Sequence, residues 1–73
     1  MPRYFFRLTN GDDLKDHEGD VLADDTQARR TAMDILIETL PSRTDHILAD
    51  GRYVVETTDE TGRLVGRLTL DSI

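Results

Sequence analysis

The sequence predicts an α+β fold in which four antiparallel strands, in the order β-β-α-β-β, carry one helix packed on one face of the sheet. Three observations predict it: alternation of side-chain character over residues 3–9, an amphipathic pattern of helical period over 24–40, and two further strand-like segments at 52–58 and 63–70. Two hairpins that flank one amphipathic helix fit a two-layer arrangement of sheet and helix. The 73 residues have the length of one small domain, covering 1–73.

The first predicted strand covers residues 3–9 and has two different sides, because successive side chains of a strand point in opposite directions. One side carries Tyr4, Phe6 and Leu8, and the other carries Arg3, Phe5, Arg7 and Thr9. Asn10-Gly11 follows, a pair that favours the positive φ angles of a two-residue hairpin turn. A short second strand is therefore expected around residues 13–16, and residues 21–22 either extend it or pack against the start of the helix.

The helix is predicted to begin after Asp24 and to end at Pro41. Asp24 can cap the first turn, with Gln27 three positions later as in an approximate capping box. Proline ends a helix because it lacks the backbone N–H that the next hydrogen bond needs. The face expected to pack on the sheet consists of Ala28, Ala32, Ile35, Leu36, Thr39 and Leu40.

The last two predicted strands are joined by a turn at residues 59–62. Their inward sides are expected to carry Tyr53, Val55 and Thr57 on one strand and Leu64, Leu68 and Leu70 on the other. Gly66 interrupts the second set, which indicates a bulge or a close backbone approach. The sequence leaves open whether the first strand neighbours the third or the fourth.

The sheet side that the helix leaves uncovered is the candidate interaction surface. It is expected to carry Arg3, Phe5, Arg7, Val54, Glu56, Arg63, Val65 and Arg67. The favoured interpretation is a small protein–protein interaction or accessory, regulatory module that acts as a homodimer and has a possible further protein partner. Its interface would have an apolar centre and a rim of arginines, because arginine is enriched at protein interfaces. The alternative is a single-stranded nucleic-acid binder of the small-antitoxin or regulator type, in which arginines contact phosphates and Phe5 stacks on a base.

The charge distribution favours the first interpretation. Residues 10–25 hold seven acidic residues against Lys15 alone, so this segment carries the whole net charge of −6. An acidic chain does not attract a phosphate backbone through its overall field. Small size adds a second argument, because a chain of this length without cysteine has few ways to gain stability other than self-association.

No catalytic residue, cofactor or metal site is expected, and the chain is not predicted to be an enzyme. With no cysteine and two histidines, His17 and His46, it has too few nitrogen and sulfur ligands for structural zinc. An EF-hand loop aligned on Gly19 would need an oxygen ligand at Leu14. No segment is apolar over the length of a membrane span, and a cytoplasmic location is expected.

The opening Met1-Pro2-Arg3-Tyr4-Phe5-Phe6 resembles that of a family of short alphaproteobacterial proteins classed as a domain of unknown function. The resemblance continues through residues 16–19, the helix and the hairpin at 56–63, and so covers nearly the whole chain. The family often has tryptophan near Tyr53 and phenylalanine near Leu70, and this chain has a smaller side chain at both positions. The resemblance supports the predicted fold and implies no catalytic or binding residue.

Overall fold

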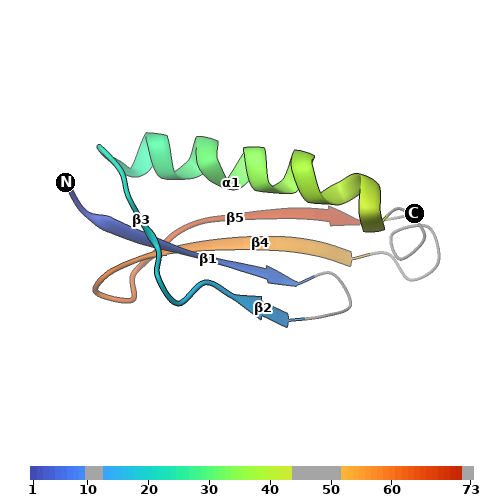
Figure 1. Cartoon of the computed structure of the whole chain (residues 1–73), viewed down its shortest axis with the longest axis horizontal. Helices are drawn as coiled ribbons and strands as arrows, with labels where there is room; N and C mark the ends of the chain where they lie inside the picture. The colour runs from blue at the N-terminus through green and yellow to red at the C-terminus, as the bar shows by residue number, and fades with distance from the viewer. Residues whose placement is uncertain (10–12, 44–51, 72–73) are drawn as a thin grey trace.

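Helix α1 lies across one face of an antiparallel sheet in the computed structural model of this chain (Figure 1). The structure describes residues 1–9, 13–43 and 52–71. The elements are β1 (Arg3–Thr9), β2 (Asp13–Lys15), β3 (Asp20–Val21), α1 (Asp25–Thr39), the 3-10 helix η1 (Leu40–Arg43), β4 (Arg52–Asp59) and β5 (Leu64–Asp71). The predicted α+β class is confirmed.

The strand order is β2-β1-β4-β5, and β3 pairs with β1 beyond the end of β2. Residues 20–21 thus form a strand of their own, so the described sheet has five strands where the sequence predicts four. The Asp16 side chain makes the turn between β2 and β3, because its Oδ1 accepts hydrogen bonds from the N–H groups of Glu18 and Gly19 at 3.2 and 3.0 Å. The first long strand neighbours β4, which resolves the open question of strand order. The Asn10-Gly11 turn lies outside the described residues.

The predicted boundaries of the helix are confirmed. Asp24 is the N-cap, and its Oδ1 accepts a hydrogen bond from the Gln27 N–H at 2.9 Å. The α-helix ends at Thr39, and the chain tightens into η1, which contains Pro41. None of the helices in the described parts of the chain has the length and apolar content needed to cross a membrane.

The core lies between α1 and the sheet. Its buried apolar residues are Tyr4, Phe6, Leu8, Ala28, Ala32, Tyr53, Val55 and Val65. The two helical residues in this set are alanines, whose small side chains let the helix backbone approach the sheet closely. Both buried tyrosine hydroxyls have partners, because Tyr4 donates to Asp25 Oδ1 at 2.8 Å and the Tyr53 hydroxyl pairs with that of Thr39. A partner for each hydroxyl offsets the cost of burying it.

A β-bulge in β5 changes which side chains enter the core. Thr57 pairs with Gly66 and Thr58 pairs with Leu64, so Val65 is the extra residue between them. One extra residue shifts the alternation of side chains along a strand. The sequence places Val65 on the outer side and Leu64 on the inner side; both placements are wrong, because Val65 is 7% exposed in the core and Leu64 is 48% exposed. The irregularity expected at Gly66 is confirmed.

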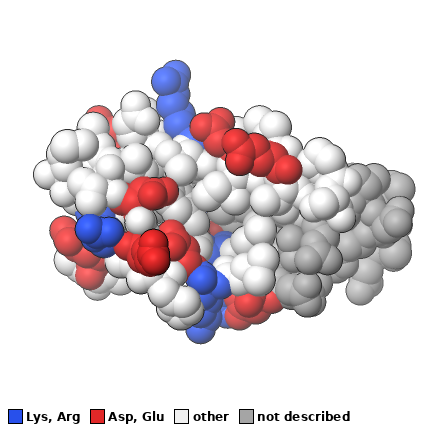
Figure 2. Space-filling view, viewed as in Figure 1, with Lys and Arg blue, Asp and Glu red and all other residues white. Residues whose placement is uncertain are grey.

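The acidic segment borders the sheet on the β1 side. Residues 13–25 run through β2 and β3 and then cross to the start of α1 (Figure 1). Figure 2 shows acidic side chains over this part of the molecule and others over α1. The negative charge is therefore concentrated next to the sheet and the helix start.

Replacing Thr57 by valine is expected to stabilise the protein by about 1 kcal/mol, measured as a higher urea midpoint. The Thr57 side chain is fully buried, and its Oγ1 has no hydrogen-bond partner in the described part of the structure. Valine removes that unpaired group at similar volume. The matched control is Thr39→Val, which should destabilise, because the Thr39 hydroxyl donates to the Ile35 carbonyl oxygen at 2.7 Å. Destabilisation by Thr57→Val would contradict the unpaired state of its hydroxyl.

Candidate functional site

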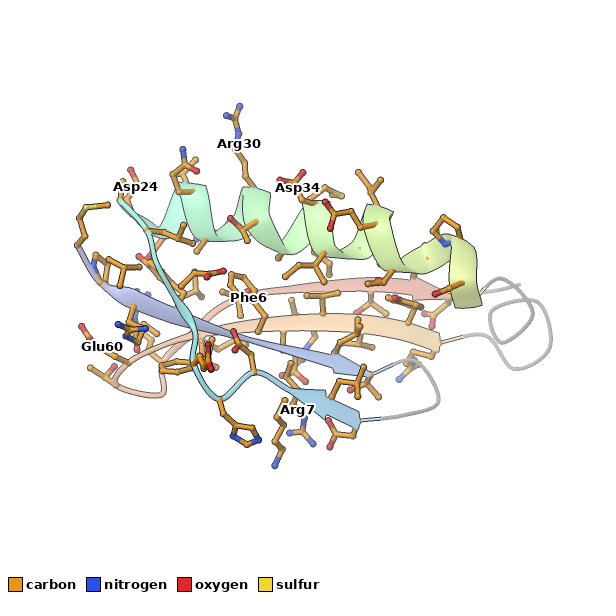
Figure 3. The ribbon with its side chains drawn as sticks, viewed as in Figure 1. Phe6, Arg7, Asp24, Arg30, Asp34 and Glu60 are labelled. Carbon is orange, nitrogen blue, oxygen red and sulfur yellow. The ribbon has the colours of Figure 1, made fainter. Side chains whose placement is uncertain are left out.

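The candidate site is the outer face of the sheet, the side turned away from α1. Figure 3 shows Phe6 on the side of β1 that faces the helix and Arg7 on the opposite side. The pairing of β4 and β5 with β1 extends this assignment across the sheet. The outer face is made of Arg3, Phe5, Arg7, Thr9, Asp13, Lys15, Val21, Arg52, Val54, Glu56, Thr58, Leu64, Arg67, Thr69 and Asp71.

A row of charged residues crosses the middle of the outer face. Lys15, Arg7, Glu56 and Arg67 stand opposite one another on β2, β1, β4 and β5. Arg67 Nη2 donates to Glu56 Oε2 at 3.1 Å. Cross-strand neighbours of opposite charge stabilise a sheet. The first and last strands therefore do not interleave their arginines directly, because β4 and its Glu56 lie between them.

Arg7 is also held by a carboxylate outside this row, that of Asp13. Its Nε and Nη2 donate to the two Asp13 carboxylate oxygens at 2.8 and 2.5 Å, a bidentate arrangement. These hydrogen bonds keep the pKa of Asp13 below its ordinary value. Arg7 is consequently already neutralised by a group of its own chain.

Next to this row is a hollow of about 280 Å³ between β1, β4 and the turn after β2. It is lined by Phe5, Phe6, Arg7, Lys15, Asp16, His17, Glu56 and Thr58. The Phe5 ring also lies against Gly19, where a Cβ would meet two ring carbons at 3.0 Å. The hollow combines an aromatic ring, cationic groups and a hydroxyl, and it is open enough to accept a flat or branched side chain of a partner.

Arg63 lies away from the outer face, which corrects its predicted position. Its Nη2 donates to both carboxylate oxygens of Asp25 at 3.2 and 3.0 Å, and its Nε donates to Asp59 Oδ2 at 3.0 Å. Tyr4 completes this Arg63 network by donating to Asp25. The network joins the β4–β5 turn to the first turn of α1 and is structural in character.

The Arg63 network shifts the pKa values of its members away from neutrality. Hydrogen bonds from Thr61, the Arg63 backbone and the Arg63 guanidinium lower the pKa of Asp59 to about 2. Burial, together with the Asp25 carboxylate, raises the pKa of Tyr4 to about 12. Neither group is poised for proton transfer near pH 7, which calls for a pKa close to the working pH.

Lowering the pH from about 4 to about 2 is expected to remove the stability that the Asp59 carboxylate contributes. A folded-state pKa of about 2, below the ordinary 3.8, means that the contribution is present at higher pH and lost as Asp59 takes up a proton. Asp59→Asn should therefore show a smaller loss of thermal stability across this window than the parent protein. Glu60→Gln, which removes the same charge from the same turn outside the network, is the control; equal acid sensitivity of Asp59→Asn and the parent would contradict the assignment.

Five of the seven predicted site residues lie on the outer face: Arg3, Phe5, Arg7, Val54 and Arg67. Val65 belongs to the core and Arg63 to the network at the helix start. Sequence reasoning missed the part played by Lys15, His17 and Thr58 in the hollow, because the turn at Asp16 that brings His17 beside β1 has no strong sequence signature. Among described residues, no group of three or more His, Asp or Glu could hold a metal ion, and His46 lies outside them.

Comparison with known proteins places the chain in a family. No curated protein and no solved structure is significantly similar to it. Residues 3–71 match the family model described as Domain of unknown function (DUF6894), and this match spans every strand and helix of the described fold. The chain therefore belongs to the DUF6894 family.

Proposed function

We propose that this chain is a small, non-catalytic interaction module that acts as a homodimer in the cytoplasm. The observation that carries the proposal is a set of exposed apolar side chains beside β5. Leu70 on β5 is 37% exposed and Met33 on α1 is 43% exposed, and Met33 lies one i,i+4 step after Arg29, whose side chain reaches β5. Exposed apolar groups gathered at one place are typical of protein interfaces.

The position of Met33 follows from Arg29, four residues before it on α1. Residues four apart lie on the same line of a helix surface. Arg29 reaches β5, where its Nε donates to the Val65 carbonyl oxygen at 3.4 Å and its Cγ lies 3.5 Å from the position of a Cβ on Gly66. Met33 therefore lies on the flank of α1 that overhangs β5, whereas Ile37 is turned about 80° from Arg29 around the helix axis, away from the buried face at Ala28 and Ala32.

The single-stranded nucleic-acid binder is the second candidate, and the hollow with Phe5, Arg7 and Lys15 favours it. Two features weigh against it. Two of the outer-face arginines already have carboxylate partners in this chain, Arg7 with Asp13 and Arg67 with Glu56, and Arg3 donates to the Glu18 carbonyl oxygen at 2.8 Å. The net charge of −6 also opposes association with phosphates.

Sedimentation equilibrium of the full chain, from micromolar to millimolar concentration, tests the proposal. A mass of twice one chain that falls on dilution is expected, and a monomer at every concentration would refute the homodimer. A fluorescent oligodeoxythymidine titrated at low salt tests the second candidate. Binding that Arg7→Ala weakens would reverse the ranking of the two functions, because Arg7 lines the hollow.

A further inference from the structure

We propose that two copies of the chain join through their β5 strands, antiparallel and with Thr69 opposite the partner's Thr69. This inference rests on the proposed homodimer and names the surface and the register that form it. The two sheets then continue as one, and the two α1 helices lie side by side on the same face.

The strand β5 is an unprotected sheet edge. It stands at the end of the strand order, and among the described residues no strand pairs with its far side. It is eight residues long, and it contains neither lysine nor proline, which natural proteins use to block edges. Arg67, Thr69 and Asp71 are exposed along it. The opposite edge differs, because β2 and β3 cover β1 there.

Hydrogen bonding in the β4–β5 hairpin determines which backbone groups of β5 are free. The Asp59 N–H donates to the Arg63 carbonyl oxygen at 3.0 Å, so the backbone of Asp59 points to β5. Backbone direction alternates along a strand, so Val55 and Tyr53 also point to β5, and their partners there are Leu68 and Leu70. The residues between and beside these partners direct their N–H and C=O groups away from β4: Arg67, Thr69 and Asp71.

A twofold axis through Thr69 uses these free groups and pairs the charges. Arg67 then stands opposite the partner's Asp71, and Asp71 opposite the partner's Arg67, on the outer face. Each is already paired within its own chain, Arg67 with Glu56 and Asp71 with Arg52 at 3.1 Å, so the contact joins these pairs into one row of alternating charge. Leu68 stands opposite the partner's Leu70 on the helix face. An axis through Arg67 or Asp71 would oppose like charges. An axis through Leu68 would put Arg67 opposite the partner's Thr69, and an axis through Leu70 would put Asp71 opposite it, so neither would pair opposite charges. The sequence of β5 is thus self-complementary in one register.

The position of α1 agrees with this axis. The helix contacts both β4 and β5, so its axis lies between them. With strands about 4.8 Å apart, the twofold axis lies half a spacing outside β5, and the two helix axes are then about 10 Å apart. Helices pack at about 8–10 Å, so the paired sheets would bring the helices into contact without a gap or a clash.

The apolar flank of α1 lies at the level of this axis along the sheet. Thr69 is three residues beyond Gly66, which is about 10 Å along β5. Both α1 and β5 run in the same direction in Figure 1. Arg29 on α1 contacts the Gly66 position. The point about 10 Å further along α1 lies between Met33 and Ile37. Met33, which is 43% exposed, would therefore face its copy near the twofold axis.

Oxidative cross-linking of Thr69→Cys tests the register, because the chain has no cysteine of its own. Two residues directly opposite each other in a hydrogen-bonded pair have Cα atoms about 5.5 Å apart, within the range of a disulfide. Thr61→Cys, exposed in the β4–β5 turn, is the matched control. We expect Thr69→Cys to form a disulfide-linked dimer at least about tenfold faster than Thr61→Cys, and urea should abolish the difference.

The possible outcomes distinguish a wrong pairing register from the absence of a dimer. A dimer by sedimentation in which Thr69→Cys cross-links no faster than Thr61→Cys overturns this inference and leaves the proposed homodimer standing. A chain that is monomeric at all concentrations overturns both. Circular dichroism of the reduced variants verifies that each is folded.

Charge reversal gives a second test that needs no cross-link. Arg67→Asp, made in a Glu56→Gln, Arg52→Gln parent so that neither reversed charge meets a like charge of its own chain, opposes like charges at both ends of the paired strands and should raise the dimer dissociation constant about tenfold or more. Adding Asp71→Arg restores opposite charges in the same register and should bring the constant back towards that of the parent. Failure of the second substitution to rescue dimerisation, in a variant that remains folded, would contradict the pairing of Arg67 with the partner's Asp71.

Discussion

Replacing Gly19 by alanine is expected to destabilise the protein by about 3 kcal/mol, from backbone strain and overpacking together. Gly19 has a φ of 71°, which side chains with a Cβ rarely adopt. A Cβ there would also lie 2.6 Å from the Tyr4 carbonyl oxygen, a backbone atom that cannot move without disturbing β1. Because a small domain has a margin of only about 3–5 kcal/mol, Gly19→Ala should keep only about 0–2 kcal/mol and be measurably unfolded at room temperature without urea.

Two other glycines separate the causes of this loss. Gly62 also has a positive φ, 87°, but no atom lies within 4 Å of its Cβ position, so Gly62→Ala measures the backbone effect alone, about 1 kcal/mol. At Gly66, a Cβ would meet Arg29 Cγ at an ordinary 3.5 Å, beside a hollow of about 200 Å³, so alanine there should stabilise slightly. Urea unfolding of the three variants gives the comparison. An equal loss at Gly19 and Gly62 would contradict the close approach to Tyr4.

The parts of the fold that the sequence predicts well depend on local chemistry. The alternation over 3–9 identifies the two sides of β1, because each inward residue is apolar and three of the four outward ones are polar. The start of α1 depends on one hydrogen bond from Gln27 to Asp24, which adjacent residues specify. The turn at residues 59–62 needs a positive φ at its last position, and glycine stands there.

The parts that the sequence does not predict depend on contacts between distant residues. The bulge at Val65 changes the direction of two side chains. Gly66 indicates that the strand is irregular, but it does not indicate which side chains the irregularity turns towards the core. Arg63 leaves the outer face because Asp25, far along the chain, offers it a bidentate partner. Asp16 forms the turn that creates β3, yet an aspartate in an acidic loop gives no distinct signal.

The outer face of the sheet differs from the interaction surface that the sequence predicts, and the reason is the same. Sequence reasoning expects an apolar centre of three residues, and the bulge removes Val65 from it and supplies Leu64 near one edge. Glu56 then pairs with Arg67 across the middle of the face. A sheet face dominated by internal ion pairs is a weaker candidate for a dimer interface than the β5 edge, where backbone groups and apolar side chains are both without partners in the described structure.

Replacing Phe6 by alanine is expected to cost about 3–4 kcal/mol, because the ring is 6% exposed in the core. The same substitution at Phe5 is the matched control: the residue type and strand are shared, and the side chain is on the opposite face. Phe5 is half-buried against Gly19, so we expect a loss of about 1–2 kcal/mol. Both losses are measured by urea unfolding at a fixed protein concentration.

This pair of variants also discriminates between the two surfaces through which a dimer could form. The unfolding free energy of a dimer includes its interface. If the copies met through their outer faces, Phe5 would be buried by the partner, and Phe5→Ala would approach the cost of Phe6→Ala and weaken association. If they meet through β5, Phe5→Ala lowers stability modestly and leaves the dissociation constant unchanged, because Phe5 is separated from that edge by β4. A large loss at Phe5 accompanied by dissociation would therefore favour the outer-face dimer that the sequence alone predicts.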